Sequence, residues 1–171
     1  MGDQRTKPHE ANANSCEESY LGQLWKLVGS RKLLTPAARA VIQDNRGRVL
    51  FVQRRDTRKW GMPAGAMELD ESILDCLKRE VTEETGLEVV SATPIAIYSG
   101  SRYTFTYPSG KQLQALAVVF RVDEWRGTLV TNTDETIDAR FFDLDDLPDT
   151  YDCYRETVKD LCEYDGRIIV K

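Results

Sequence analysis

Histidine is nearly absent from this sequence of 171 residues: the single copy, His9, lies in a polar stretch near the N-terminus. A zinc site built on histidines, a Ser-His-Asp triad and a histidine general base are therefore not expected, because each needs histidine in the folded part of the chain. Any acid-base chemistry falls to carboxylates, tyrosine or lysine.

Cysteine pairs and long apolar runs are also lacking. The four cysteines form no CxxC pair and no disulfide-dense pattern, and no apolar run is long enough for a signal peptide or a transmembrane helix. These absences predict a reduced, cytoplasmic protein without a membrane partner.

Positive charge is in deficit, since the formal net charge is −5 and the sequence pI is near 5.0. This balance argues against a general nucleic-acid surface, and an anionic ligand would need a metal ion or local Arg and Lys side chains. Apolar residues make up 41% of the chain, which is enough for the core of one ordinary domain.

One helix is predicted over residues 72–85. This stretch contains neither Gly nor Pro, Asp70 and Ser72 can cap its start, and Gly86 can end it. Its apolar and acidic residues recur at helical spacing, so the helix is expected to pack one face on the core.

Carboxylates share the core-facing stripe of this helix. At about 100° per residue, Glu80 and Glu84 fall in line with Ile73 and Leu77, and Glu83 lies beside them. The like-charged pairs destabilise the helix, and their place near its C-terminal end adds a penalty from the helix dipole. A hard divalent cation bound by oxygen ligands would offset this repulsion. The alternative is a solvated acidic face, which would not be expected to share its stripe with two aliphatic residues.

The stretch from Gly65 to Leu87 resembles the Nudix box of the Nudix hydrolases. The family pattern is G, five residues, E, seven residues and then R-E-U-x-E-E-x-G-U, where U is aliphatic. Every specified position is filled in this sequence, by Gly65, Glu71, Arg79, Glu80, Val81, Glu83, Glu84, Gly86 and Leu87. Two departures lie in the loop that leads into the helix, at Ala64 and Asp70, where many relatives carry Gly.

The resemblance implies an α/β (α+β) protein with the Nudix fold, an α/β/α sandwich around a mixed β-sheet. The expected organisation is a disordered tail over residues 1–18, an N-terminal helix and lead-in over 19–35, the Nudix domain over 36–163 and a C-terminal extension over 164–171.

The resemblance also implies an activity. Nudix hydrolases use Mg²⁺, for which Mn²⁺ can substitute, to cleave the pyrophosphate linkage of a nucleoside diphosphate joined to another moiety X. Examples of such substrates are ADP-ribose, a nucleotide sugar and a (d)NTP. The products are a nucleoside monophosphate and P-X. The alternative is a Nudix-like sensor that binds a nucleotide without hydrolysing it.

Carried over residue by residue, the box implies a metal site. Glu80, Glu83 and Glu84 would be metal ligands, together with the backbone carbonyl of Ala64. Arg79 would hold the carboxylates in place. Glu71 would support the helix or act on the metal indirectly, and Glu68, just before it, is a possible outer contributor or a solvated loop acid.

The base that activates water has two candidates. One is Glu83, acting beside the metal ions. The other lies in the polar loop over 133–136, which resembles a family loop that brings a late glutamate to the metals; there Glu135 is favoured over Asp134 because its side chain is longer. The alternative for this loop is an ordinary acidic surface loop.

Arginines and aromatic residues are candidates for contacts with the nucleotide substrate. Arg54 and Arg55 precede the box and could receive phosphate, whereas Trp60 and Tyr103 could stack on a base, as could Tyr98 and Phe105. The alternatives are solvated arginines and aromatic side chains buried in the core.

The remaining elements follow from periodicity. A short amphipathic helix is expected over 20–28, packed on its own domain or forming the contact of a possible homodimer. A second helix is expected over 152–162. Strands are expected over 37–43 and 48–54, joined as a hairpin, and over 87–99, 103–107, 116–122, 127–130 and 140–142.

Overall fold

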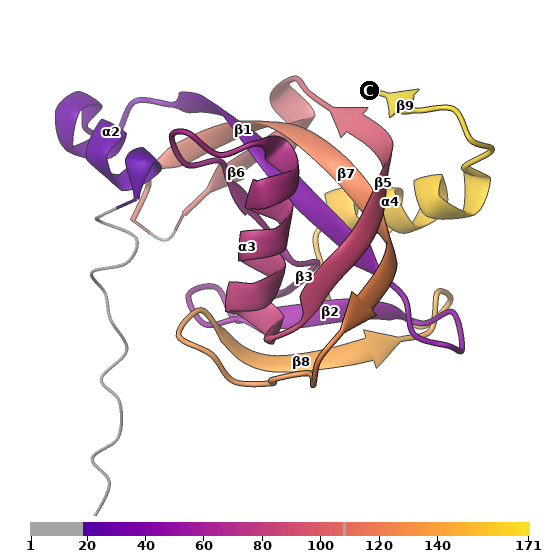
Figure 1. Ribbon diagram of the computed structural model, residues 1–171. Coiled ribbons are helices and arrows are strands. Elements are labelled where there is room, and N and C mark those ends of the chain that lie inside the picture. Colours follow the sequence, from indigo (N-terminus) through magenta and orange to yellow (C-terminus); the bar gives the residue numbers. More distant parts are fainter. Residues whose placement is uncertain (1–18, 108) are drawn as a thin grey trace, which may run out of the picture.

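The computed structural model describes residues 19–107 and 109–171, so the tail predicted to be disordered over 1–18 lies outside the described residues. A mixed six-stranded sheet forms the centre of the molecule, with β4, β1, β7, β5 and β9 in that spatial order and β6 also paired with β7 (Figure 1). Its strands are β1 (Leu33–Ile42), β4 (Ala64–Ala66), β5 (Glu88–Tyr98), β6 (Thr104–Thr106), β7 (Gln112–Arg126) and β9 (Ile169–Val170).

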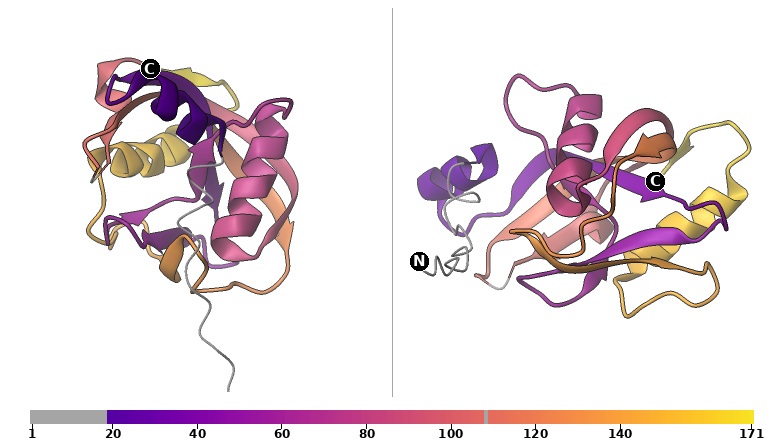
Figure 2. Two further views of the ribbon diagram at one scale, coloured as in Figure 1. Left: turned by 90° about the vertical axis from the view of Figure 1, so that its left-hand side faces the viewer. Right: turned by 60° about the horizontal axis from the view of Figure 1, so that its bottom comes forward.

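A separate three-stranded sheet completes the strands, with β2 between β3 and β8. Its members are β2 (Val49–Arg54), β3 (Trp60–Gly61) and β8 (Thr136–Phe142). The segment before β8 lies beside the C-terminal end of α3 (Figure 2), where the Thr136 hydroxyl donates to the Glu84 carbonyl at 3.1 Å.

Two helices cover opposite sides of the strands, as Figure 2 shows: α3 (Ile73–Thr85) and α4 (Asp152–Glu163). Alternation along β1 explains this arrangement, because Ala40 and Ile42 join the cluster under α3 whereas Val41 joins the cluster under α4. The two predicted helices and the mixed α+β fold are confirmed.

A third helix, α2 (Tyr20–Val28), has the predicted bounds. Ser19 caps its start, and Gly29, at φ +67°, follows its end. Leu21 and Trp25 are buried against Leu113 of β7, so the apolar face of α2 packs on its own domain.

Two predicted strand features are wrong. Residues 37–43 and 48–54 do form strands, but β1 and β2 lie in different sheets and share only the bridge between Gln43 and Val49, so they do not form a hairpin. Residues 127–130 form no strand. The Val130 N–H donates instead to the Thr85 carbonyl, which ties this segment to the end of α3.

The C-terminal extension carries a strand that the sequence did not predict. β9 pairs in parallel with β5, and Lys171 donates its N–H to the carbonyl of Ile97. The Lys171 ammonium pairs with the buried carboxylate of Asp160 in α4 at 2.7 Å. The C-terminal extension therefore adds a short strand to the sheet and is tied to α4.

Among the described residues, no helix has the length and apolarity needed to cross a membrane.

Candidate active site

The ends of α3 fix where its carboxylates lie. Ser72 and Asp75 form a capping box at the start, in which each side chain accepts from the backbone of the other. Gly86 ends the helix in the left-handed conformation, at φ +70°. Asp70 also has a positive φ, of 64°, a conformation that Gly adopts without steric cost and that Asp tolerates.

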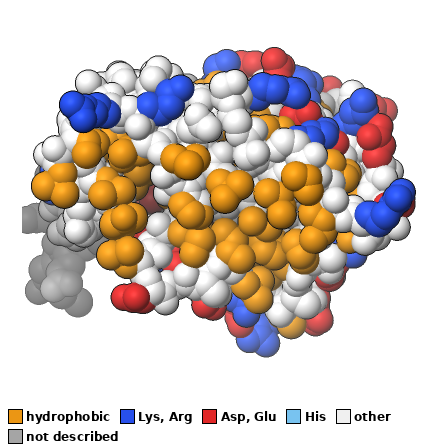
Figure 3. Space-filling model, turned by 90° about the horizontal axis from the view of Figure 1, so that it is seen from above, with side chains coloured by type: hydrophobic (Ala, Val, Ile, Leu, Met, Phe, Trp, Pro, Cys, Tyr) orange, Lys and Arg blue, Asp and Glu red, His pale blue; other side chains and the backbone are white. Residues whose placement is uncertain are grey.

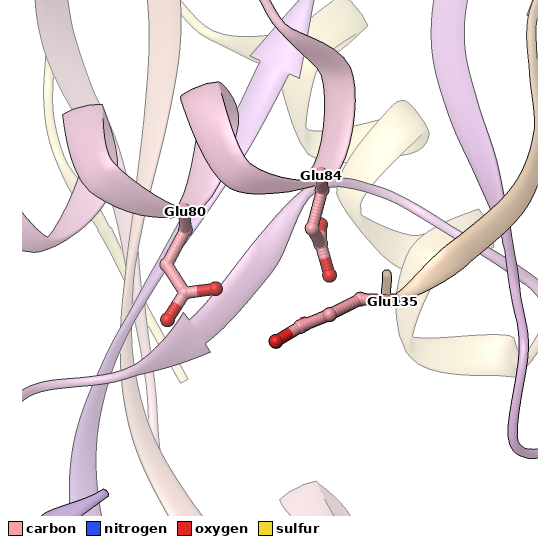
Figure 4. A group of neighbouring side chains, drawn as sticks. All are labelled: Glu80, Glu84 and Glu135. Carbon is pink, nitrogen blue, oxygen red and sulfur yellow. The ribbon is translucent and has the colours of Figure 1, made fainter. Parts of the chain in front are cut away.

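Three glutamates meet beside the last turns of α3. Glu80 and Glu84 are buried, with 8% and 1% of their surfaces exposed, and the exposed Glu135 reaches them from the loop before β8 (Figure 4). One carboxylate oxygen from each lies within 4.8 Å of the others. Two glutamates of the acidic stripe predicted on α3 are therefore buried, and Glu135, the loop glutamate favoured from the sequence, lies next to them.

Gly65 of β4 makes room for this cluster. A Cβ atom placed on Gly65 would lie 1.9 Å from Oε1 of Glu80 and 2.0 Å from its carboxyl carbon. The Ala64 N–H, one residue earlier, donates to Oε2 of Glu84 at 3.1 Å. The first glycine of the box thus lets the backbone of β4 pass directly against the carboxylates.

Arg79 ties three box carboxylates together. It donates to both oxygens of Glu71, at 3.1 and 2.8 Å, to Glu80 at 2.7 Å and to Glu83 at 3.1 Å. This pairing lowers the pKa of Glu71. The geometry matches the role that the resemblance implies for Arg79, and Glu84 is the box glutamate that Arg79 does not contact.

Glu83 lies apart from the cluster. About half of its side chain is exposed, and its carboxylate pairs with Arg79 at 3.1 Å, outside the group formed by Glu80, Glu84 and Glu135. Its assignment as a metal ligand and as the water-activating base stays a prediction.

Burial disfavours charge on the clustered carboxyls. It raises the pKa of Glu80 to about 7, in spite of the attraction of Arg79, and it raises the pKa of Glu84 well above the ordinary range. Partial withdrawal from water also raises the pKa of Glu135, and the charge of Glu83 adds to that shift. Without a cation, these groups hold protons more readily than free glutamates do.

The cluster has the donor chemistry of a hard divalent cation. It offers carboxylate oxygens at a spacing that one ion can bridge. The two neighbouring arginines, Arg54 and Arg79, are shared among five carboxylates, those of Asp56, Glu71, Glu80, Glu83 and Glu84. Mg²⁺ and Mn²⁺ prefer such oxygen ligands. The residues present therefore fit the metal that the Nudix box implies.

The two arginines expected to receive phosphate have different surroundings. Arg54 lies 3.7 Å from Oε1 of Glu84 and also pairs with Asp56 at 3.1 Å, so it stands beside the cluster. Arg55 instead donates from its guanidinium to Asn132 and to the carbonyls of Thr133, Asp134 and Thr136, at 2.7 to 3.2 Å. Its N–H also donates to the carbonyl of Glu135.

A cavity of about 460 Å³ opens next to the cluster, a size that suits a small-molecule ligand. Arg54, Ala64 and Gly65 form the wall nearest the carboxylates. Aromatic side chains supply other parts of the wall, namely Phe105, Tyr107, Tyr151 and Tyr154.

Trp60 and Tyr103 are not among the residues that line this cavity. Trp60 packs edge-on against Phe142. Tyr103 is 2% exposed, its ring stacks on Tyr98 with centroids 4.9 Å apart, and its hydroxyl donates to Glu156. Both aromatic side chains are therefore packed against other core residues, which is the alternative to base stacking given in the sequence analysis.

Two cavity residues escaped the sequence reasoning, Arg39 of β1 and Tyr154 of α4. The signal for Arg39 was present, since it is the one charged residue in the otherwise uncharged strand LLTPAARAVI. Tyr154 gave no such signal, because an aromatic residue on an amphipathic helix is normally part of the core.

The sequence model of the NUDIX domain matches residues 33–161 of the chain. The chain belongs to the Nudix family. Among solved Nudix structures, a MutT Nudix hydrolase from Burkholderia pseudomallei gives a TM-score of 0.63 at 23% identity, covering 75% of this chain and 98% of that one. The Nudix fold predicted from the box is therefore confirmed.

Two curated relatives carry names that describe a reaction. The NAD-capped RNA hydrolase NudC of Vibrio atlanticus is 35% identical over 112 residues, which cover 64% of this chain and 37% of NudC. The ADP-ribose pyrophosphatase of Methanocaldococcus jannaschii is 29% identical over 121 residues, covering 69% of this chain and 66% of that protein. The chain thus spans little more than a third of the length of NudC.

Proposed function

We propose that this Nudix protein is a Mg²⁺-dependent pyrophosphohydrolase that cleaves a nucleoside diphosphate derivative, NDP-X, to a nucleoside monophosphate and P-X. The observation that carries the proposal is the cluster of Glu80, Glu84 and Glu135 in a complete Nudix box, at the edge of a cavity of ligand size. The names of the two relatives suggest NAD-like ends, ADP-ribose and similar compounds as the first substrates to test.

Each residue has a distinct role in this proposal. Glu80, Glu84 and Glu135 would hold the metal, with Glu83 and the Ala64 carbonyl as further ligands, and Arg79 fixes the carboxylates. When bound, Mg²⁺ or Mn²⁺ supplies charge neutralisation of the diphosphate and activation of water. Glu135 is the favoured base, because it comes from the loop and can approach the water from outside the helix.

In this proposal Arg55 positions the loop that carries Glu135. Its five hydrogen bonds all end on residues 132–136, so it orients Glu135 rather than contacting phosphate itself. Arg54 keeps the expected role at the phosphates, because it lines the cavity beside Glu84.

The test is the release of nucleoside monophosphate from ADP-ribose, NAD, a nucleotide sugar and a dNTP, with Mg²⁺ and with EDTA. We expect release from at least one compound with Mg²⁺ and none with EDTA, and we expect Glu84→Gln to abolish it. Glu135→Gln should depress kcat far more than KM. If the protein binds a compound but releases no product from any of them, the non-hydrolysing sensor is the better assignment.

We also propose a cytoplasmic homodimer. The three described cysteines, Cys76, Cys153 and Cys162, are free, as expected for a reducing compartment. The predicted dimer contact was α2. Its residues Leu21 and Trp25 are buried within the domain, so they are not available to a partner. Leu27, which is 83% exposed, remains as an apolar side chain on the surface of α2. The sheet surface next to it offers a larger contact.

That surface is the outer face of β1, β7, β5 and β9 beyond the start of α3, and Figure 3 shows apolar side chains gathered on this side. Leu34 is 68% exposed, Leu116 41% and Val170 71%. Pro36 lies opposite Leu116 in the ladder, and Val170 opposite Ile97. An uncharged patch of this kind can pair with its own copy without like-charge repulsion, in spite of the net charge of −5.

A further inference from the structure

Arg39 is a buried cation in the middle of β1. The residue is 3% exposed, and its guanidinium carbon lies 4.4 Å from the ring centre of Tyr154 and 5.8 Å from that of Tyr98. Its Nη1 donates to the Cys153 carbonyl at 3.1 Å and to the Thr157 hydroxyl at 2.8 Å. All of these partners are uncharged.

No carboxylate among the described residues pairs with Arg39 within 4.0 Å. A buried arginine normally needs an anionic partner, because the loss of hydration is only partly repaid by aromatic rings and neutral acceptors. Arg54, which also lines the cavity, has two such partners in Glu84 and Asp56. Arg39 is therefore a cation whose counter-charge is not supplied by the described part of the chain.

One edge of the Arg39 guanidinium is left for a ligand. Nε is buried without a hydrogen-bond partner, and Nη2 has only the Cys153 thiol, at 3.8 Å. Nε–H and Nη2–H together form the fork that binds two oxygens of a phosphate or carboxylate. Two further buried polar atoms without partners, the hydroxyls of Thr57 and Thr104, also belong to residues that line the cavity.

Arg39 lies close to the carboxylate cluster. It is directly opposite Ala64 in the antiparallel ladder of β1 and β4, where facing Cα atoms are about 5 Å apart. Ala64 donates to Glu84, and both Arg39 and Ala64 line the cavity. If one phosphate of a diphosphate is bound at the metal site formed by the carboxylates, the adjacent phosphate would therefore lie near Arg39.

We propose that Arg39 binds the phosphate on the cavity side of the substrate's diphosphate, the one next to the phosphate held at the metal site. The inference rests on the proposed function and adds an anion-binding residue from β1, outside the Nudix box. The guanidinium supplies the charge and the fork, and the rings of Tyr154 and Tyr98 keep it in place while the cavity is empty.

The test uses metal-free protein, so that it does not depend on hydrolysis. In EDTA, inorganic pyrophosphate and AMP are titrated by calorimetry against the wild type, Arg39→Gln, Arg39→Lys and Arg126→Gln. Arg126 is an exposed arginine paired with Glu88 and serves as the charge-matched control. We expect Arg39→Gln to weaken pyrophosphate binding at least about tenfold, Arg39→Lys to weaken it less, and Arg126→Gln to leave it unchanged.

With Mg²⁺ and a hydrolysed substrate, Arg39→Gln should raise KM about tenfold or more and change kcat much less, since the contact is made in the ground state as well. The inference is overturned if the wild type binds neither anion in EDTA, or if Arg39→Gln loses no more affinity than the Arg126→Gln control. Absence of hydrolysis with intact anion binding would instead contradict the proposed function while supporting the Arg39 site. If Arg39→Gln does not fold, the wild-type and Arg39→Lys titrations decide.

Discussion

Glu80 links protonation to the stability of the metal-free protein. Its pKa is about 7 in the folded chain and near 4.5 when unfolded, so the folded state binds the proton more tightly. Stability from this group is present below pH 4.5 and is lost as the pH rises through 7. The loss amounts to roughly 3 kcal/mol, since one pKa unit is worth about 1.4 kcal/mol.

We therefore expect the Tm of the protein in EDTA to fall between pH 5 and pH 8, and Mg²⁺ to restore it at pH 8. Glu80→Gln, which keeps the shape without the titration, should flatten this slope. A Tm in EDTA that rises steadily over the same interval would show that Glu80 is charged in the folded protein.

Gly65→Ala separates folding from the metal site. The added Cβ would collide with the end of the Glu80 side chain, which can swing away, rather than with backbone. We expect the variant to fold with a Tm within a few degrees of the wild type, but to bind Mn²⁺ at least about tenfold more weakly, because the carboxylate has left the cluster. Titration followed by electron paramagnetic resonance measures this. Wild-type Mn²⁺ affinity in Gly65→Ala would show that Glu80 is not needed as a ligand.

On the scale of elements, the loop over 132–136 depends on the side chain of Arg55, the residue that follows β2. Arg55→Gln removes the guanidinium that donates to four acceptors in this loop, so Glu135 should lose its fixed position. We expect kcat to fall toward that of Glu135→Gln with little change in KM, and the double variant to be no worse than Glu135→Gln alone.

The control for this cycle is Arg167→Gln, because Arg167 is an exposed arginine paired only with its neighbour Asp165. If Arg55→Gln raises KM instead and its effect adds to that of Glu135→Gln, then Arg55 contacts phosphate, as the sequence alone suggested.

Local pattern was enough to find α3 and its carboxylates, because caps, periodicity and the Nudix box all lie within about 25 residues of one another. Local pattern could not predict how the strands divide between the two sheets. β1 and β2 look like a hairpin in the sequence, but β1 pairs with β7 and β2 with β8, and both pairings are long-range. Arg39 and Tyr154 meet across more than a hundred residues, a contact that no local spacing reports.

For the whole molecule, the exposed sheet face predicts self-association. Sedimentation or light scattering should give a dimer mass for the wild type at micromolar concentration, and Leu116→Glu should give a monomer of 19.5 kDa. Deleting residues 1–30 tests α2 instead. A monomer mass for the wild type would contradict the homodimer, and a monomer from the deletion but not from Leu116→Glu would place the contact on α2.

The carboxylate cluster joins a helix that packs on one sheet to a loop that leads into the other. Glu80 and Glu84 belong to a helix that packs on the six-stranded sheet, whereas Glu135 directly precedes β8 of the three-stranded sheet. An ion held by all three would act as a removable cross-link between the two halves of the fold. Amide hydrogen exchange in β2 and β8 should then slow when Mn²⁺ is added to the wild type and stay unchanged in Glu135→Gln, so that loading the site and stiffening the molecule are the same event.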